Sequence, residues 1–243
     1  MRRRRPALAA ALVASVVALA GCAALPALPG PMPTGFAPTD GATATTSRGH
    51  LSPDGFDAAR RIAVRIRNVG CDSLSTGSGF AIDATTLITN RHVVANAAAI
   101  QISTYDGRDI AATAASTAAL ADLAIVRTAT ALPAFPDLAD RDPVRGDAIS
   151  VVGYPMGGEL TITTGQVIDE TTDPLHANLG EVLVTDAQVE PGSSGSAVLD
   201  SDGRVVGVVY AKNAANQSYV VPVSTLKTLL PDTSSFNTAP ACR

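Results

Sequence analysis

The stretch Glu190-Pro191-Gly192-Ser193-Ser194-Gly195-Ser196-Ala197-Val198 places a serine between glycines in a predicted tight turn, just before an apolar run typical of a strand. Such a turn can expose the Ser194 hydroxyl and direct backbone N–H groups to one point beside it. Acyl transfer requires these two elements, an attacking oxygen and a site for an oxyanion. Gly192 suits a turn where a side chain would crowd a bound carbonyl. Turns of this kind are common in a chain rich in Gly, Ser and Ala, so the interpretation depends on partners elsewhere.

The chain has three histidines, and the sequence around one of them suits a general base for Ser194. His92 ends the apolar, β-prone run Gly79–Val94, whereas His50 lies in a Pro/Thr/Gly-rich stretch and His176 lies in a polar loop. A serine nucleophile needs a general base, and imidazole is suited to that role near neutral pH. The alternative is that His92 only ends a strand and hydrogen-bonds locally. The serine turn favours the catalytic interpretation.

Asp122 opens the strongly apolar segment Asp122–Val126. A carboxylate at the start of a buried strand is costly unless a partner compensates for its lost hydration. It can be an ordinary turn aspartate, or it can orient His92 by accepting a hydrogen bond from Nδ1–H. In the second case it would stabilise the imidazolium that forms when Ser194 gives up its proton.

The order His, Asp, Ser and the sequences around these residues resemble the chymotrypsin-like (trypsin-fold) serine proteases, in particular the protease domains of the bacterial HtrA/Deg type. The likeness covers about residues 58–230. The order also differs from the Ser, Asp, His order of α/β-hydrolases. The blocks that carry the likeness are Gly77–Phe80 with Leu87–Val94, Ala121–Val126, Val152–Pro155 with Thr163–Val167, and Thr185–Ala187 with Pro191–Ser196.

The resemblance implies an all-β fold of two antiparallel six-stranded β-barrels with a short C-terminal helix. The first barrel would lie at about 58–140 and the second at about 143–231. Short β-prone runs with turn signals between them agree with this, and Asp202-Gly203 is a strong hairpin signal. We expect the terminal helix at Val223–Leu230, ended by Pro231. Strands are expected at Ile62–Ile66, Gly79–Ile82, Thr86–Thr89, Ala99–Thr104, Leu123–Thr128, Ala148–Gly153, Leu160–Ile168, Val182–Thr185, Ala197–Leu199, Val205–Ala211 and Tyr219–Val221.

The resemblance also assigns roles to individual residues. Ser194 would be the nucleophile, His92 the general base and then acid, and Asp122 the residue that orients His92. The oxyanion hole would be formed by the backbone N–H groups of Gly192 and Ser194. Family members that are activated by insertion of a new N-terminus carry an aspartate where this chain has Ser193, so we do not expect that activation here.

Substrate specificity is expected from residues near the nucleophile. In the family, the residue six before the serine lies at the base of the pocket for the P1 side chain, and here it is Gln188, with Val189 beside it. Neither is acidic, so a basic P1 residue is not expected. The strand that contains Tyr210 and Ala211 should pair with extended substrate, and Tyr219 would narrow the pocket. The alternative is that Gln188 and Tyr219 face packing or solvent.

The N-terminus is typical of an export signal. Arg2–Arg5 form a basic region, and Ala7–Ala20 form an apolar region too short for a membrane span. Leu19-Ala20-Gly21-Cys22 resembles a bacterial lipobox, which predicts a signal peptide at 1–21 and an acylated Cys22 that anchors the protein to the membrane. Cleavage at a nearby ordinary signal-peptide site, or an uncleaved anchor, is the alternative. Residues 22–52 are rich in Pro, Gly and Thr and are expected to form a flexible tether.

The remainder, 53–243, is expected to be one protease domain. With Cys22 lipidated, Cys71 and Cys242 form the only possible pair, and an exported location favours a disulfide over two free thiols. HtrA-type proteases usually carry a PDZ domain after the protease, but about a dozen residues follow the expected terminal helix. A PDZ domain is therefore not expected.

Composition excludes several other classes of function. Without the four arginines at positions 2–5, 14 Lys and Arg face 22 Asp and Glu, a formal charge of −8, so a nucleic-acid partner is not expected. No Cys/His cluster has zinc spacing and no Gly-rich phosphate loop follows a strand, so neither metal nor cofactor is expected. The sequence predicts an exported, lipid-anchored serine endopeptidase that cleaves polypeptides at the outer face of a bacterial membrane, in protein quality control or processing. The alternatives are a catalytically silent peptide-binding or chaperone-like relative, and a structural envelope lipoprotein.

Overall fold

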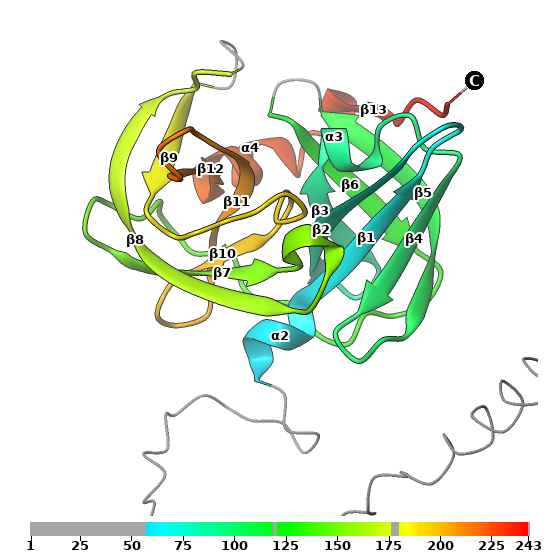
Figure 1. Cartoon of the computed structure of the whole chain (residues 1–243), viewed down its shortest axis with the longest axis horizontal. Coiled ribbons are helices and arrows are strands. Elements are labelled where there is room, and N and C mark those ends of the chain that lie inside the picture. The colour runs from blue at the N-terminus through cyan, green and yellow to red at the C-terminus, as the bar shows by residue number, and fades with distance from the viewer. Residues whose placement is uncertain (1–56, 119–120, 176–179, 243) are drawn as a thin grey trace, which may run out of the picture. The chain divides into compact units, whose positions relative to one another are not determined.

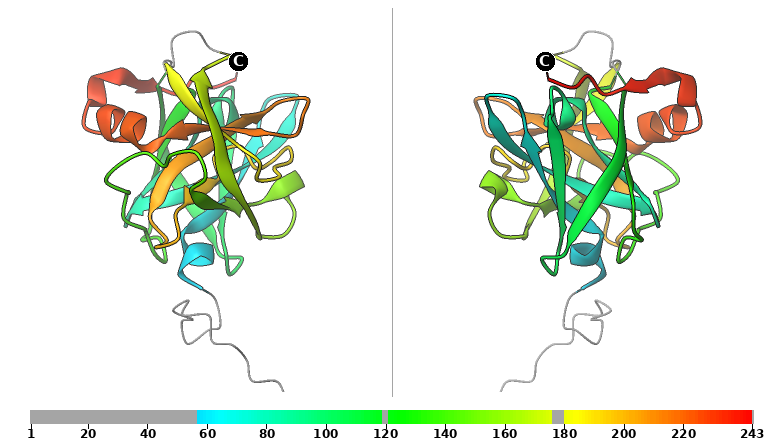
Figure 2. Two further views of the ribbon diagram at one scale, coloured as in Figure 1. Left: turned by 90° about the vertical axis from the view of Figure 1, so that its left-hand side faces the viewer. Right: turned by 90° about the vertical axis from the view of Figure 1, so that its right-hand side faces the viewer.

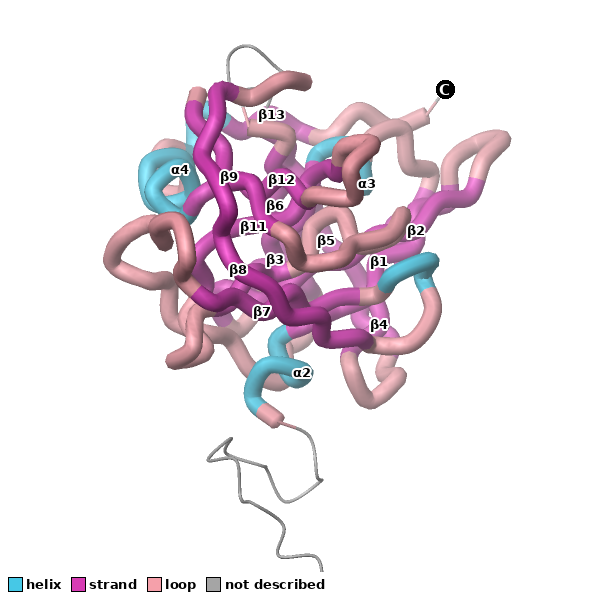
Figure 3. Tube along the Cα trace, turned by 60° about the vertical axis from the view of Figure 1, so that its left-hand side comes forward, coloured by secondary structure: helices cyan, strands magenta, loops and turns pink. Residues whose placement is uncertain are grey.

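The computed structural model of the chain describes residues 57–118, 121–175 and 180–242. The predicted signal peptide, Cys22 and the tether lie outside the described residues, as do His50 and His176. Most of the regular secondary structure of the described residues is strand (Figure 3).

The first barrel contains the strands that precede residue 129. They are β1 (Ala63–Val69), β2 (Leu74–Asp83), β3 (Thr86–Asn90), β4 (Ala99–Thr104), β5 (Asp109–Ala118) and β6 (Leu123–Thr128). They pair antiparallel in the order β5-β4-β1-β2-β3-β6, and pairing of β5 with β6 closes the barrel. A C-terminal strand, β13 (Phe236–Thr238), adds to β5. The helix α2 (Ala58–Ile62) leads into β1, and its first turn is capped by Asp57, whose carboxylate accepts a hydrogen bond from the Arg60 N–H at 2.9 Å.

The second barrel follows in sequence and is also closed. Its strands are β7 (Ala148–Gly153), β8 (Thr161–Thr172), β9 (Glu181–Thr185), β10 (Ala197–Leu199), β11 (Val205–Lys212) and β12 (Ser218–Pro222). They pair in the order β10-β11-β12-β9-β8-β7, which returns to β10. The short 3-10 helix η2 (Pro155–Gly157) connects β7 to β8. The helix α4 (Val223–Leu229) and the 3-10 helix η3 (Thr233–Ser235) lead back to β13.

Each barrel has its own apolar core, and a third cluster joins the two. That joining cluster includes Phe80, Ile88 and Leu123 from the first barrel and Tyr154, Leu199 and Tyr210 from the second. Full burial of an apolar side chain contributes about 1.5–3 kcal/mol. The two barrels therefore share an apolar interface that fixes residues of one against residues of the other.

The predicted fold class is confirmed: the protein consists of two closed six-stranded antiparallel barrels with a short C-terminal helix (Figure 1). The strands β5 and β13 were not predicted. The first described element, α2, and the C-terminal segment lie at opposite ends of the domain (Figure 2). Within the described residues, no helix is long and apolar enough to cross a membrane.

Candidate active site

Asp122 and His92 form a close, directional pair in the first barrel. Asp122 Oδ2 lies 2.5 Å from His92 Nδ1. Asp122 is 4% exposed, whereas the His92 side chain is 47% exposed. The buried carboxylate thus fixes one ring nitrogen and leaves the other edge of the imidazole accessible.

The backbone around Asp122 explains how the pair is held. The helix α3 (Arg91–Val94) carries His92, and its preceding residue, Asn90, makes no side-chain capping bond. Asp122 supplies the cap instead: its carbonyl accepts the Arg91 N–H at 2.7 Å and its Oδ1 accepts the His92 N–H at 3.2 Å. The residue adopts φ 47°, a left-handed conformation that aspartate tolerates better than most residues. The side chain and the backbone of Asp122 therefore fix the position of His92 together.

The serine turn begins with a hydrogen-bonded β-turn. Ser193 N–H donates to Glu190 O at 2.9 Å, Pro191 lies at the second position and Gly192 lies at the third with φ 95°. These are the features of a type II turn, which favours Pro and then Gly. Pro191 O accepts the Met156 N–H from η2 at 2.6 Å. In a trans peptide the N–H points opposite to the C=O, so the Gly192 N–H points away from η2.

The Ser194 N–H is oriented in the same way. Ser193 O accepts the Ser196 N–H at 3.0 Å, so the Ser194 N–H of that peptide points to the other side. Among the described residues, neither the Gly192 N–H nor the Ser194 N–H has a hydrogen-bond partner. Two unpaired backbone donors at one turn, each fixed through the carbonyl of its own peptide, can bind an oxyanion without reorganisation.

Ser78 connects this turn to the first barrel, and sequence reasoning gave it no role. The Ser78 N–H donates to Ser194 O at 2.8 Å, and Ser78 Oγ donates to Gly192 O at 2.8 Å. Ser78 Oγ also accepts the Tyr154 N–H at 2.8 Å, and Ser78 O accepts Thr89 Oγ1–H at 2.6 Å. Ser78 is fully buried, so these bonds are sheltered from water. The run Gly77-Ser78-Gly79 was noted as a motif, and its central polar residue between two glycines was the available signal.

A chain of hydrogen bonds links the segment that carries His92 to Ser194. Thr89, three residues before His92, bonds to Ser78, which bonds to Ser194. No hydrogen bond between Ser194 Oγ and the ring of His92 is present in the described part of the chain. Catalytic hydrogen bonds in unliganded enzymes are often long and tighten only when substrate binds.

A cavity beside the serine turn is lined by one of the residues predicted for the specificity pocket, Gln188. Val189 is buried in the core of the second barrel with Val209 and Val220. Gln188 lines this cavity of about 230 Å³ with Gly153, Pro155 and Ser193 among others, and its Nε2–H donates to Asp186 O at 3.3 Å. Tyr210, Ala211 and Tyr219 lie on β11 and β12 and do not line that cavity.

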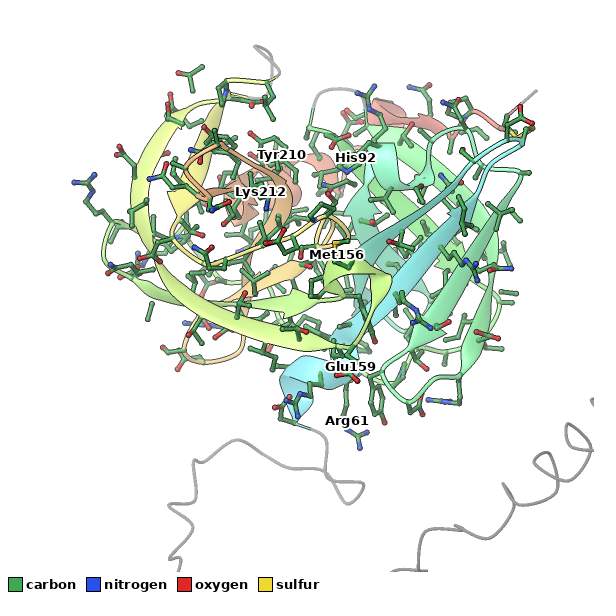
Figure 4. The ribbon with its side chains drawn as sticks, viewed as in Figure 1. Arg61, His92, Met156, Glu159, Tyr210 and Lys212 are labelled. Atoms are coloured by element: carbon green, nitrogen blue, oxygen red, sulfur yellow. A yellow bond between two sulfur atoms is a disulfide. The ribbon has the colours of Figure 1, made fainter. Side chains whose placement is uncertain are left out.

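Tyr210 lies at a β-bulge beside the site. The β11–β12 register shifts between Val209 and Ala211, which leaves Tyr210 as the extra residue. Its hydroxyl donates to Asp173 Oδ1 at 2.6 Å. Burial and then this bond to a carboxylate raise the pKa of Tyr210 well above its usual value, so the phenol stays protonated. Figure 4 shows Tyr210 and Lys212 on β11, in the second barrel, with His92 across from them on the first.

Lys212 Nζ bonds Glu190 Oε2 at 2.8 Å. This ion pair ties the end of β11 to the start of the serine turn.

The two remaining predicted residues are joined in the structure. A disulfide links Cys71 to Cys242, with Cα atoms 5.8 Å apart and a sequence separation of 171. It fastens the C-terminal segment to the β1–β2 hairpin. Within residues 57–118, 121–175 and 180–242, no group of three or more His, Cys, Asp or Glu is placed to hold a metal ion.

Comparison with known proteins identifies relatives of this domain. Residues 77–208 match the family model of the trypsin-like peptidase domain. The Serine protease Do-like HtrA of Bacillus subtilis (strain 168) is 34% identical over 134 residues, which is 50% of this chain and 29% of that protein. The Probable periplasmic serine endoprotease DegP-like of Chlamydia pneumoniae is 29% identical over 147 residues, 59% of this chain and 30% of that protein.

A solved structure agrees with these matches. The crystal structure of the Rv3671c protease from M. tuberculosis, active form, aligns with a TM-score of 0.66 at 25% identity, covering 76% of this chain and 85% of that chain. The chain spans less than a third of the length of the two curated relatives. It belongs to the trypsin-like peptidase family, and the predicted resemblance to HtrA-type proteases is confirmed.

Proposed function

We propose, from this family membership, that the protein is a serine endopeptidase that cleaves polypeptides through an acyl-enzyme. Ser194 is the nucleophile, His92 is the general base and then the acid, and Asp122 holds the imidazole. One observation carries the proposal: Ser78 ties the segment that carries the Asp122–His92 pair to a serine turn with two backbone N–H groups that have no partner among the described residues. Each part alone is common, but acyl transfer requires all of them together.

The geometry gives each group a defined task. His92 Nε2 takes the proton of Ser194 Oγ as the oxygen attacks the peptide carbonyl. The imidazolium that forms is stabilised by Asp122 at Nδ1, and the Gly192 and Ser194 N–H groups bind the oxyanion. His92 then gives its proton to the leaving amine. A water molecule, deprotonated in turn by His92, hydrolyses the acyl-enzyme.

The edge of β11 supports binding of an extended chain. Val209 still pairs with the serine turn, since Gly195 N–H donates to Val209 O at 2.8 Å and Val209 N–H donates to Ser196 O at 3.1 Å. Beyond Val209, the described residues provide no backbone partner for β11 on that side. The acyl side of a substrate can add there as a strand, along Tyr210 and Ala211.

We further propose that the protein is exported and is anchored through acylated Cys22 at the outer face of the membrane, where it acts in protein quality control or processing. The basic and apolar N-terminal segments and the lipobox-like sequence support export and acylation. The printed name of the Chlamydia relative, a probable periplasmic endoprotease, supports the same compartment. Mass spectrometry of the membrane fraction tests this: a diacylated N-terminal peptide that disappears in Cys22→Ala is expected.

Covalent labelling tests the catalytic proposal. The purified full-length chain in mild detergent should react with a fluorophosphonate at neutral pH, while Ser194→Ala and His92→Ala should not. A second candidate function is peptide binding without catalysis, since the described residues show a hydrogen bond of the His92 ring to Asp122 and none to Ser194 Oγ. A folded wild-type protein that binds peptides and resists the probe would establish that alternative.

A further inference from the structure

A groove of about 800 Å³ crosses the outer face of the first barrel and ends at η2, which is bonded to the serine turn. It is lined along β1, β2, β4 and β5, and at one end by Gly157 of η2. A Cβ placed on Gly192 would lie 2.8 Å from the Gly157 backbone nitrogen, so the end of the groove touches the residue that supplies an oxyanion donor.

Strand register arranges the groove as two rows of side chains. Residues directly opposite in a ladder project to the same face. The first row is Ser78, Arg65, Ser103 and Asp109, and the second is Thr76, Arg67, Gln101 and Ala111. Ser78 Oγ bonds Gly192 O, so this face of the sheet is the one turned toward the serine turn.

The two arginines differ in their partners. Arg65 is half-buried, and its Nη1–H donates to Gly157 O at 3.3 Å, which braces η2. Arg67 is exposed, and its guanidinium has no hydrogen bond or ion pair with any residue the structure describes. The carboxylate in the groove, Asp109, lies two strands away in the other row and accepts a bond from Ser103 Oγ at 2.9 Å. The groove therefore has a net positive end near the catalytic turn.

We propose that this groove binds the leaving-group side of the polypeptide substrate and selects an acidic side chain there through Arg67, with Arg65 beside it. The inference rests on the proposed peptidase function and names its substrate class. The acyl side of the substrate follows β11 on the second barrel, so the leaving side continues past His92 onto the first. Figure 4 shows Met156 of η2 between these two regions.

The spacing predicts where the acidic residue binds. Thr76 lies two residues along β2 from Ser78, about 7 Å, and Arg67 lies one strand further, about 5 Å. The two displacements are perpendicular, so Ser78 and Arg67 lie about 9 Å apart, and an extended chain at about 3.3 Å per residue spans this distance in about three residues. We expect Asp or Glu at the third residue after the cleaved bond or at a position next to it.

The test profiles cleavage sites in a proteome-derived peptide library with the full-length protein. The wild type should enrich Asp and Glu at those positions, and Arg67→Gln should lose the enrichment. Arg145→Gln is the matched control, because Arg145 is an exposed arginine of the second barrel paired with Asp169. For a peptide that the protein cleaves, kcat/KM is compared between the form with Asp at the selected position and the form with Asn there. The two forms should differ about fivefold for the wild type and less than twofold for Arg67→Gln.

A substrate without a leaving-side peptide separates the two proposals. The wild type and Arg67→Gln should hydrolyse a peptidyl thioester at the same rate. Arg65→Gln should lower kcat for this substrate, because it removes the Arg65–Gly157 hydrogen bond that holds η2 in place. Two results would overturn the groove inference alone, provided that the wild type labels normally with the fluorophosphonate. One is no enrichment of Asp or Glu after the cleaved bond, and the other is the same enrichment in Arg67→Gln. Failure to label would overturn the proposed function and this inference together.

Discussion

Removing the Ser78 hydroxyl should reduce catalysis although Ser78 does not touch substrate. Ser78→Ala leaves Gly192 O without its 2.8 Å donor and Tyr154 N–H without its 2.8 Å acceptor. Each buried backbone group left unpaired costs about 1–3 kcal/mol, so we expect about 2–4 kcal/mol of lost stability after partial relaxation. Gly192 lies in the serine turn, which carries the proposed oxyanion donors, and Tyr154 directly precedes η2, which holds that turn through the Met156–Pro191 bond.

The catalytic loss follows from the same geometry. Deleting one oxyanion donor lowers kcat by about 100- to 1,000-fold. Ser78→Ala only loosens the donors, so about a 10- to 100-fold decrease in kcat is expected, with little change in KM because the donors act on the transition state. Urea unfolding measures the loss of stability. Thioester hydrolysis gives kcat and is measured under conditions in which the variant is fully folded. Ser75→Ala, an exposed serine of the same strand, is the control and should change little. A folded Ser78→Ala with wild-type kcat would refute the reasoning.

Three further variants test other parts of the structure. Asp122→Asn should fold but lower kcat by about 10,000-fold, because the imidazole loses its orienting carboxylate; labelling rates check this, and a loss below tenfold would contradict it. Tyr210→Phe removes a donor to the Asp173 carboxylate and should cost about 1.5–3 kcal/mol in urea unfolding at pH 7. Because the folded state raises the pKa of Tyr210, its stabilisation is present below the ordinary value of 10.0 and is lost as pH rises above it, so the variant should lose less stability at high pH than the wild type. Replacing Cys71 and Cys242 by serine opens a loop of 171 positions and should cost about 2–5 kcal/mol, equal to the effect of reductant on the wild type.

The fold was predictable where strands carry β-branched residues. The expected strands Ala99–Thr104, Leu123–Thr128, Ala148–Gly153 and Ala197–Leu199 coincide with β4, β6, β7 and β10. The strand β5 was missed because Asp109–Ala118 is rich in alanine, which has low β propensity. Pairing with β4 on one edge and β6 on the other holds it in the sheet, so tertiary structure overrides its local preference.

The proposed catalytic side chains can be picked out of the sequence for a chemical reason. A nucleophile, a base and an orienting acid need particular residue types, and His92, Asp122 and Ser194 stand out because few residues of those types occur in suitable contexts. The assignment of the specificity pocket stays a prediction. Val189 was assigned to it by its place in the sequence, yet its apolar side chain packs with Val209 and Val220.

The backbone groups that orient the site leave almost no mark on the sequence. The Met156 N–H fixes Pro191 O, and with it the direction of the Gly192 N–H, but every residue except proline has an N–H to offer. The Met156 side chain is 71% exposed and contributes nothing to this bond. Ser78 is the exception, since its side chain bonds two backbone groups from different segments. The reactive groups of the site are therefore side chains, which the sequence reveals directly. Their geometry is fixed by main-chain hydrogen bonds between segments that only the folded structure brings together.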